Sequence, residues 1–249
     1  MERALILGGT SEANLLAAAI AAAGLDAIYS YAGRTQIPVN QPLPVRTGGF
    51  GGASGLADCI RREKITHIVD ATHPFATEIS RNAVAACAAT NTPLIALERA
   101  PWAKMPGDHW IEVADLASAV AALPKEPARV FLAIGRQHIA PFSAQPQHAY
   151  TLRFVDAAEG LLPVPNADLI VSRGPFSFDS ELEMMRTRRI EWLVSRNSGG
   201  TGARAKIDAA RELGLPVIMI SRPDLPDRPR TESVQEVMRW LSHRTCLGA

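Results

Sequence analysis

A run of glycine and hydroxyl residues near the start of the chain has the composition of a phosphate-binding turn. The aliphatic segment Leu5 to Leu7 stops at two glycines, and an Ala- and Leu-rich segment follows. Glycine lets an anion approach the main chain, and the N–H groups of a helix N-terminus attract it. The motif G-x-G-x-x-G is incomplete, because Thr10 and Ala13 replace its second and third glycines. The alternative is therefore a turn that only packs the strand against the helix and binds no ligand. The residues concerned are Gly8, Gly9, Thr10 and Ser11.

Arg34 is the most informative single residue for the choice of ligand. With Gly33 it ends the second predicted strand, where NAD-binding proteins commonly carry Asp or Glu for the ribose 2′-hydroxyl. An arginine there instead suits a 2′-phosphate and predicts NADP(H). The alternative is an exposed arginine that only ends the strand. A second glycine-rich turn follows the third predicted strand and includes Gly49, Phe50 and Gly51.

His73 is the candidate for proton transfer. It follows Thr72 at the end of a predicted strand and precedes Pro74, near where a nicotinamide would reach. A histidine there is a candidate general acid, or a hydrogen-bond donor to cofactor or substrate. The alternative is that its ring satisfies a local backbone group. The sequence contains no H-E-x-x-H motif, and no triad spacing or carboxylate pair stands out, so we expect no metal site.

Glycines and cations also gather in the C-terminal half. An Asn-Ser-Gly-Gly loop precedes a predicted helix and is flanked by basic residues. Free main-chain N–H groups beside cations predict a second anion-binding site. Helices often begin with Ser and Gly, so each residue alone also fits a structural role. The candidates are Arg136, Arg173, Arg196, Asn197, Ser198, Gly199, Gly200 and Lys206.

The elements that must position these residues follow from the alternation of short apolar runs with helical segments. This alternation predicts an α/β fold with doubly wound, Rossmann-like parallel sheets, and right-handed crossovers place all strand C-termini along one edge. Ligands of such sheets bind beyond that edge, where all the candidate loops fall. Strands are expected at 3–7, 26–31, 44–46, 67–71, 93–97, 110–113, 129–134, 150–155, 168–172, 192–195 and 216–220.

The segment Pro124 to Pro127, polar and with two prolines, predicts a domain boundary. We therefore expect one Rossmann-like domain over residues 1–124 and a second over residues 125–249. The last predicted helix, at about 233–242, follows a Pro-rich stretch. It fits either domain, and the pattern does not decide between them.

The bulk composition narrows the class of protein. The chain has 249 residues, of which 47% are hydrophobic and 20% charged, as in an ordinary soluble globular protein. With a formal net charge of only +1, the protein has no overall positive electrostatic field that would attract nucleic acid or an acidic membrane surface. The cysteines Cys59, Cys87 and Cys246 are odd in number and widely spaced, which indicates a reducing compartment. We expect a cytoplasmic protein without nucleic-acid or membrane partners.

Six blocks of the sequence occur together in a recognisable order. The most specific are D-A-T-H-P-F-A at 70–76 and N-S-G-G at 197–200, the latter followed by Ala205–Ile207. The others are Gly8–Ala13, Ala32–Arg34, Gly48–Gly51 and Gly174–Ser177. Over nearly the whole chain these blocks resemble the precorrin-6A reductase family of cobalamin biosynthesis. Arg196 and Ala203 depart from the family, where many members have Lys and Thr.

The resemblance implies a two-domain reductase that uses NADPH to reduce one double bond of the tetrapyrrole precorrin-6A, giving precorrin-6B. Domain 1–124 would bind NADPH and domain 125–249 the substrate. A large, flat macrocycle with many carboxylates needs a wide cleft and several basic residues, and the nicotinamide supplies the hydride without a metal. His73 or a water would deliver the proton. To the substrate candidates above the resemblance adds Gly174, Phe176 and Ser177.

Three other functions remain open. The first is a cobalt-precorrin-6A reductase, since the sequence does not report whether the substrate carries cobalt. The second is a two-domain nucleotide-sugar transferase, and the third is a redox-sensing NADP(H)-binding module. Low net charge and a doubly wound fold fit a monomer or a homodimer.

Overall fold

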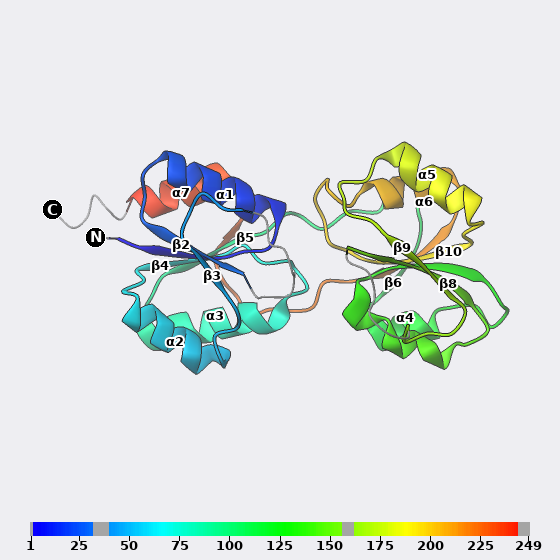
Figure 1. Ribbon diagram of the computed structural model, residues 1–249, viewed down its shortest axis with the longest axis horizontal. Coiled ribbons are helices and arrows are strands. Elements are labelled where there is room, and N and C mark those ends of the chain that lie inside the picture. The colour runs from blue at the N-terminus through cyan, green and yellow to red at the C-terminus, as the bar shows by residue number, and fades with distance from the viewer. Residues whose placement is uncertain (1, 32–39, 156–161, 244–249) are drawn as a thin grey trace. The chain divides into compact units, whose positions relative to one another are not determined.

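The computed structural model describes residues 2–31, 40–155 and 162–243 and divides the chain into two compact units (Figure 1). Unit 1 consists of Met1–Ala100 and Asp224–Ala249, and unit 2 consists of Pro101–Pro223. The chain therefore passes from unit 1 to unit 2 and back. These two crossings replace the boundary predicted after Pro124, which lies inside unit 2 because the strand before it pairs in the sheet of that unit.

Unit 1 is built on a six-stranded sheet with the order β12-β5-β4-β1-β2-β3. The strands pair in parallel, and Ala4 of the central strand lies between Ala27 on one side and His67 on the other. The central strand β1 (Ala4–Leu7) is apolar on both faces, as expected where helices cover both. The strands are β1 (Ala4–Leu7), β2 (Ala27–Tyr31), β3 (Val45–Thr47), β4 (His67–Asp70), β5 (Leu94–Leu97) and β12 (Arg230–Thr231).

The helices of unit 1 form a layer on each face of this sheet. Helices α1 (Ser11–Ala22) and α7 (Val234–His243) cover one face, and α2 (Gly52–Arg62) and α3 (Thr77–Thr90) cover the other (Figure 1). Successive strand residues point to opposite faces. Ile6 accordingly packs in one core cluster with Leu16 and Leu241, whereas Leu7 packs in the other with Leu56. The terminal helix, which fitted either predicted domain, thus belongs to unit 1.

Unit 2 contains a second six-stranded parallel sheet, with the order β6-β11-β10-β7-β8-β9. Its edge strand β6 pairs with β11, Trp110 lying opposite Val217. The run at 110–113, which was expected in the first domain, therefore belongs to unit 2. The strands are β6 (His109–Val113), β7 (Arg129–Ala133), β8 (Ala149–Phe154), β9 (Ala167–Val171), β10 (Trp192–Arg196) and β11 (Pro216–Ile220).

The faces of the second sheet are covered in the same way. Figure 1 shows α5 and α6 on one face and α4 on the other. Trp102, Phe131 and Ile207 are buried in the cluster beneath α5 and α6. The helical elements are α4 (Leu116–Ala121), α5 (Phe178–Thr187) and α6 (Ala205–Glu212), with 3₁₀ turns η1 (Arg136–His138) and η2 (Ala140–Ala144).

Unit 1 has the strand order 3-2-1-4-5-6 known from dinucleotide-binding sheets, and unit 2 shares its 3-2-1-4-5 part. In unit 1 the sixth place is taken by β12, which follows the return crossing. In unit 2 it is taken by β6, which precedes all the other strands of its sheet. The predicted doubly wound α/β fold is confirmed, and each sheet takes an edge strand from outside the regular β-α alternation.

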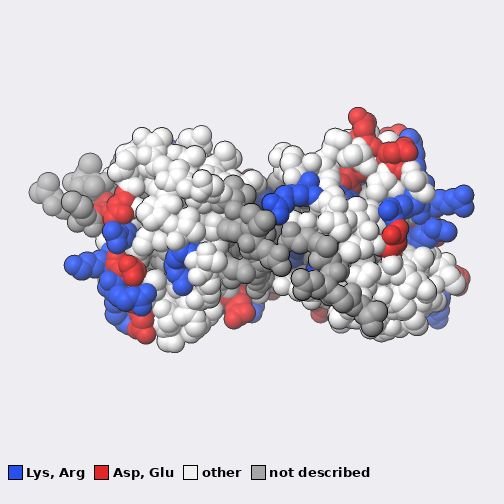
Figure 2. Space-filling model, in the orientation of Figure 1, with Lys and Arg blue, Asp and Glu red and all other residues white. Residues whose placement is uncertain are grey.

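Two surface properties bear on function. On the face shown in Figure 2, basic and acidic side chains lie interspersed, as expected from the formal net charge of +1. Within the described ranges, every helix is too short or too polar to cross a membrane.

Candidate functional site

The sheet of unit 1 reverses its winding between β1 and β4, and the loops after these two strands border that point. Chain connections run from β1 to β2 and β3 on one side, and from β4 to β5 and β12 on the other. Thr10 joins the two loops: its Oγ1 donates a hydrogen bond to the Ala71 carbonyl at 2.8 Å and accepts one from Ala13 N at 3.1 Å. The second bond caps α1. The glycine turn and the Thr72–His73 loop are thus held together at the place where such sheets bind ligands.

Tyr29 determines the shape of the glycine turn. A Cβ on Gly8 would lie 2.2 Å from Tyr29 Cζ, so only glycine fits there. Gly9 has a φ of +118° and open space where a Cβ would point. The Tyr29 hydroxyl accepts a hydrogen bond from Gly9 N at 3.0 Å and donates one to Asn14 Oδ1 at 2.9 Å. Burial raises the pKa of Tyr29 well above its usual value, which keeps the phenol protonated as a donor.

The second glycine turn is held by Arg46, which was not among the residues predicted from the sequence. Its Nη1 donates to the Gly48 carbonyl at 3.0 Å, and its Nη2 donates to the Gly49 carbonyl at 3.2 Å. Its Cζ lies 3.8 Å from the centroid of the Phe50 ring. Gly51 caps α2 with a left-handed φ of +83° and no side-chain bond. The turn therefore has a cation and an aromatic ring fixed against each other at the carboxyl end of β3.

The Thr72–His73 loop is ordered by bonds within itself and to β4. Asp70 Oδ1 accepts hydrogen bonds from Thr72 N at 3.2 Å and from Thr72 Oγ1 at 2.7 Å. Phe75 N donates to His73 Nδ1 at 3.2 Å, so a neutral His73 ring carries its proton on Nε2. His73 therefore satisfies a local backbone group through Nδ1, and its neutral ring has its N–H at Nε2. Gly33 and Arg34 lie outside the described residues.

The corresponding reversal in unit 2 lies between β7 and β10. Gly135, with a φ of +86°, and the exposed Arg136 follow β7, and Arg196 ends β10. Arg173 and Gly174 follow β9, two strands further along the sheet, and are exposed. The predicted basic residues thus lie along one edge of the sheet, with Arg173 furthest from the reversal.

The Asn197–Gly200 loop is bound to Trp102. Asn197 Oδ1 accepts from Trp102 N at 2.7 Å, and Asn197 Nδ2 donates to the Trp102 carbonyl at 2.9 Å. The Trp102 indole Nε1 donates to the Gly200 carbonyl at 2.7 Å. The side-chain amide predicted to bind substrate is therefore engaged with the main chain, and Ser198 and Gly199 are buried.

Two further cations contact this loop region. Arg222, which sequence reasoning missed, donates from Nε to the Asn197 carbonyl at 3.0 Å and from Nη2 to the Ser198 carbonyl at 3.1 Å. Its place two residues after β11 was the available signal, because every loop that follows a strand at this edge is a candidate for ligand binding. Lys206 donates to the Ala203 carbonyl at 2.8 Å, and its Nζ lies 5.1 Å from the Trp102 ring centroid.

The segment after β9 is organised around α5. Ser177 caps this helix by accepting a hydrogen bond from Ser180 N at 3.2 Å. Phe176 packs under the guanidinium of Arg153, whose Cζ lies 4.1 Å from the ring centroid. Arg153 in turn donates to the buried Glu181 carboxylate, with Nη2 2.7 Å from Oε2. Phe176 and Ser177 therefore have structural partners, and Arg153 is neutralised by its own ion pair.

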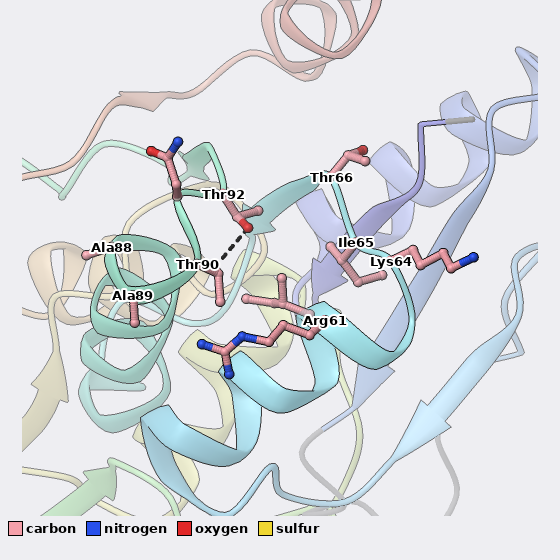
Figure 3. Close-up of a pocket in the computed structure, with 10 residues that line it drawn as sticks. Arg61, Lys64, Ile65, Thr66, Ala88, Ala89, Thr90 and Thr92 are labelled. Atoms are coloured by element: carbon pink, nitrogen blue, oxygen red, sulfur yellow. Dashed lines mark hydrogen bonds between the residues drawn. The ribbon is translucent and has the colours of Figure 1, made fainter.

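An open hollow of about 600 Å³ lies elsewhere on unit 1 (Figure 3). It is lined by the ends of α2 and α3 and by the segments that lead into β4 and β5, and Thr90 and Thr92 share a 2.8 Å hydrogen bond there. These segments precede the strands, so the hollow lies at the amino ends of β4 and β5. Ligands of open parallel sheets bind at the opposite, carboxyl edge.

Comparison with known proteins identifies similar chains over almost the full length. The family model described as precorrin-6x reductase CbiJ/CobK matches residues 3–242. The precorrin-6A reductase of Rhodobacter capsulatus is 56% identical over 242 residues, covering 97% of this chain and 96% of the relative. The cobalt-precorrin-6A reductase of Priestia megaterium is 29% identical over 252 residues, covering 97% and 98%. A solved structure of the CobK precorrin-6A reductase matches with a TM-score of 0.94 at 56% identity, covering 98% and 97%.

Proposed function

The chain belongs to the precorrin-6x reductase family, and we propose that it uses NADPH to reduce one double bond of precorrin-6A, giving precorrin-6B, in cobalamin biosynthesis. The resemblance that the sequence blocks predicted is thereby confirmed, and family membership replaces the transferase and redox-sensor interpretations. The observation that carries the proposal is the glycine turn at the winding reversal of a sheet with the dinucleotide-binding strand order, in a chain 56% identical to a precorrin-6A reductase.

The residues of unit 1 fit the diphosphate of a nicotinamide dinucleotide. Gly9 faces open space, and α1 is a helix of 12 residues whose first-turn N–H groups have no intrahelical acceptor. Gly9 N is bound to Tyr29, and the Ser11 hydroxyl donates to Glu12 Oε2 at 3.2 Å, so we assign the phosphate contacts to the amides of Ser11 and Glu12. The proposed cofactor site comprises Gly8, Gly9, Thr10, Ser11, Gly33, Arg34, Gly49, Phe50, Gly51 and Thr72.

The chemistry needs a hydride, a proton and a fixed geometry. When bound, the reduced nicotinamide supplies the hydride, which carries both electrons to one carbon of the double bond. The neighbouring carbon takes a proton, and we propose His73 Nε2–H or a water as its source. Thr10 Oγ1 donates to the carbonyl and Asp70 Oδ1 accepts from the N–H of the Ala71–Thr72 peptide, and this fixes the start of the loop that presents His73.

Unit 2 is proposed to bind the acidic macrocycle. Its exposed carboxyl-edge residues Arg136 and Arg173 are suited to substrate carboxylates. Asn197 acts differently in this proposal, because it shapes the loop through Trp102 instead of touching the substrate. The proposed substrate site comprises Arg136, Arg173, Gly174, Phe176, Ser177, Arg196, Ser198, Gly199, Gly200 and Lys206, and Asn197 supports its loop through Trp102.

The proposal is tested by following the near-ultraviolet absorbance of NADPH with precorrin-6A in metal-free and cobalt-containing forms. We expect oxidation of one NADPH per product with the metal-free substrate, in accordance with the higher identity to the precorrin-6A reductase. Turnover of the cobalt form alone would assign the chain to the cobalt-dependent chemistry. Binding of NADPH without turnover of either form would refute the reductase function.

The same assay tests the cofactor preference. We expect Arg34→Ala to lower the NADPH/NADH ratio of kcat/KM by about tenfold or more, because a charge-assisted hydrogen bond to the 2′-phosphate is lost. Arg62→Ala, which removes an exposed arginine of α2 in the same unit, is the matched control and should leave the ratio unchanged. An unchanged ratio in Arg34→Ala would remove Arg34 from the cofactor site.

A further inference from the structure

A buried cluster of charges lies at the carboxyl ends of β4 and β5. Arg228 Nη2 is 3.1 Å from Glu98 Oε2 and 3.5 Å from Asp70 Oδ2. The side chains of Arg228, Asp70 and Glu98 are only 8%, 1% and 14% exposed. One guanidinium therefore forms ion pairs with two carboxylates at a position with little access to water. The Pro-rich segment that carries Arg228 was not among the residues that the sequence pointed to.

This cluster is incompletely satisfied. Among the described residues, Asp70 Oδ2 and Arg228 Nε have no hydrogen-bond partner, although both atoms are buried. Removing charges from water is costly, and an imperfectly bonded pair does not recover the whole cost. Stability alone is therefore a poor explanation for the cluster, and its position suggests a role in the site.

The cluster is connected to the proposed proton donor through Asp70. One carboxylate oxygen of Asp70 faces Arg228, and the other accepts both hydrogen bonds from Thr72. Thr72 Oγ1 also lies 3.3 Å from Ser80 Oγ in α3, and the next residue is His73. The orientation of the Asp70 carboxylate thus sets where the Thr72–His73 loop lies.

Arg228 reaches this place because β12 pairs with β5. Ala96 N donates to the Pro229 carbonyl at 2.8 Å, and Glu98 N donates to the Thr231 carbonyl at 2.9 Å. These bonds fix the main chain on both sides of Arg230 and bring the preceding Arg228 between the two carboxylates. The last strand of the chain therefore contributes to a loop that lies early in the sequence.

We propose that Arg228 is a positioning residue for hydride and proton transfer: by holding the Asp70 carboxylate it fixes the Thr72–His73 loop against the bound nicotinamide and substrate. The functional half of this inference, that Arg228 aids hydride and proton transfer, rests on the proposed function. Its structural half, that Arg228 holds the Thr72–His73 loop in place, does not. Small displacements of a positioned reactive group lower kcat strongly, whereas the phosphate contacts made at the glycine turn stay intact.

The structural half is tested in the protein without cofactor, by residue-resolved amide hydrogen exchange of wild type, Arg228→Met and Arg230→Met. Arg230 is the matched control, because it is an exposed arginine two residues away on the same segment. We expect exchange of the Thr72 amide to rise about tenfold in Arg228→Met only, since its acceptor is no longer held. The Ala71 amide, which donates to the Leu7 carbonyl within the sheet, should be unchanged. Faster exchange throughout unit 1, or none at Thr72, would overturn the inference.

The functional half is tested by separating kcat from cofactor binding. We expect Arg228→Met to lower kcat about a hundredfold and to raise the isotope effect with 4-deuterated NADPH, while the Kd for NADPH stays within about twofold. Arg228→Lys, which keeps the charge without the planar fork, should fall between wild type and Met, and it replaces Met if that variant does not fold. Equal kcat values in Arg228→Met and Arg230→Met would refute the positioning role. Absence of turnover in wild type would instead refute the proposed function, with the Thr72 exchange still deciding the structural half.

Discussion

The phenol of Tyr29 reaches from β2 to the turn after β1, where it contacts two glycines in different ways. It fills the space beside Gly8, and its hydroxyl bonds to Gly9 N. Asn14 Oδ1 accepts the hydrogen bond of the phenol and another from Gln41 Nε2 at 2.8 Å. A single buried side chain thus decides which amides of the turn stay available for a phosphate.

Substitution of Gly8 should show this dependence directly. Gly8→Ala places a Cβ 2.2 Å from the Tyr29 ring, so we expect a loss of about 1–3 kcal/mol in the free energy of unfolding and weaker NADPH binding. Gly202→Ala is the matched control, because a Cβ at that glycine meets no atom within 4 Å. Denaturant unfolding and fluorescence titration with NADPH measure both effects. Wild-type affinity in Gly8→Ala would show that the turn does not bind the cofactor.

At the level of elements, the loops at the carboxyl edges are held by partners distant in sequence. In unit 1 the loops after β1 and β4 are joined through Thr10 and Ala71, and Arg99 Nη1 pairs with Glu12 Oε2 at 2.9 Å at the start of α1. In unit 2, Trp102 and Arg222 both bind the loop after β10. Trp102 and Arg222 lie next to the two crossings between the units, so the connecting segments are anchored on the loop proposed to bind substrate.

The Asn197–Trp102 contact provides the prediction at this scale. Asn197→Ala removes both side-chain bonds to the Trp102 main chain, and we expect unit 2 to lose about 1–3 kcal/mol of stability and the KM for precorrin-6A to rise. Trp102→Phe removes the indole bond to Gly200 and also leaves space in the buried cluster of unit 2, so its loss of stability combines both effects. Glu126→Ala, at an exposed turn of unit 2, should stay within about 0.5 kcal/mol of wild type in unfolding experiments. Unchanged stability and KM in Asn197→Ala would mean that the loop keeps its shape without these two bonds.

At the scale of the whole molecule, the path of the chain decides which residues share a unit. Residues 224–249 return to unit 1, where β12 completes the sheet and α7 packs on α1. Val237 and Leu241 are spaced by one helical turn and are both buried in the same cluster as Leu16 and Ile20. The C-terminal helix is therefore part of the core beneath the glycine turn.

Leu241→Ala tests this assignment. We expect it to destabilise unit 1 by about 2–3 kcal/mol, because it leaves a cavity beside α1, and to weaken NADPH binding at temperatures where unit 1 begins to unfold. Arg239→Ala, on the same helix with a side chain 68% exposed, is the control and should be nearly neutral. Thermal unfolding with and without NADPH measures both. Equal melting temperatures for the two variants would contradict the packing of α7 in the unit 1 core.

Local pattern was sufficient for much of the fold and for the candidate loops. Apolar runs that end in glycine or a cation predicted the strands and the carboxyl-edge loops, and Thr10 caps α1 as its type and position indicated. The blocks around His73 and Asn197 were specific enough to indicate the family, which the comparisons confirm. These features depend on neighbours along the chain, and a sequence displays such neighbours directly.

Tertiary structure alone decided the features that join distant parts of the chain. Strand pairing placed Trp110 in unit 2 and brought β12 back to unit 1, because a parallel edge strand is chosen by the sheet it joins and not by its own residues. For the same reason Arg46, Arg222 and Arg228 were not identified beforehand. Each contacts its partners only after strands from separate segments have aligned. The sequence by itself thus determined what chemistry the strand ends carry, and the pairing of the strands determined which of those residues meet.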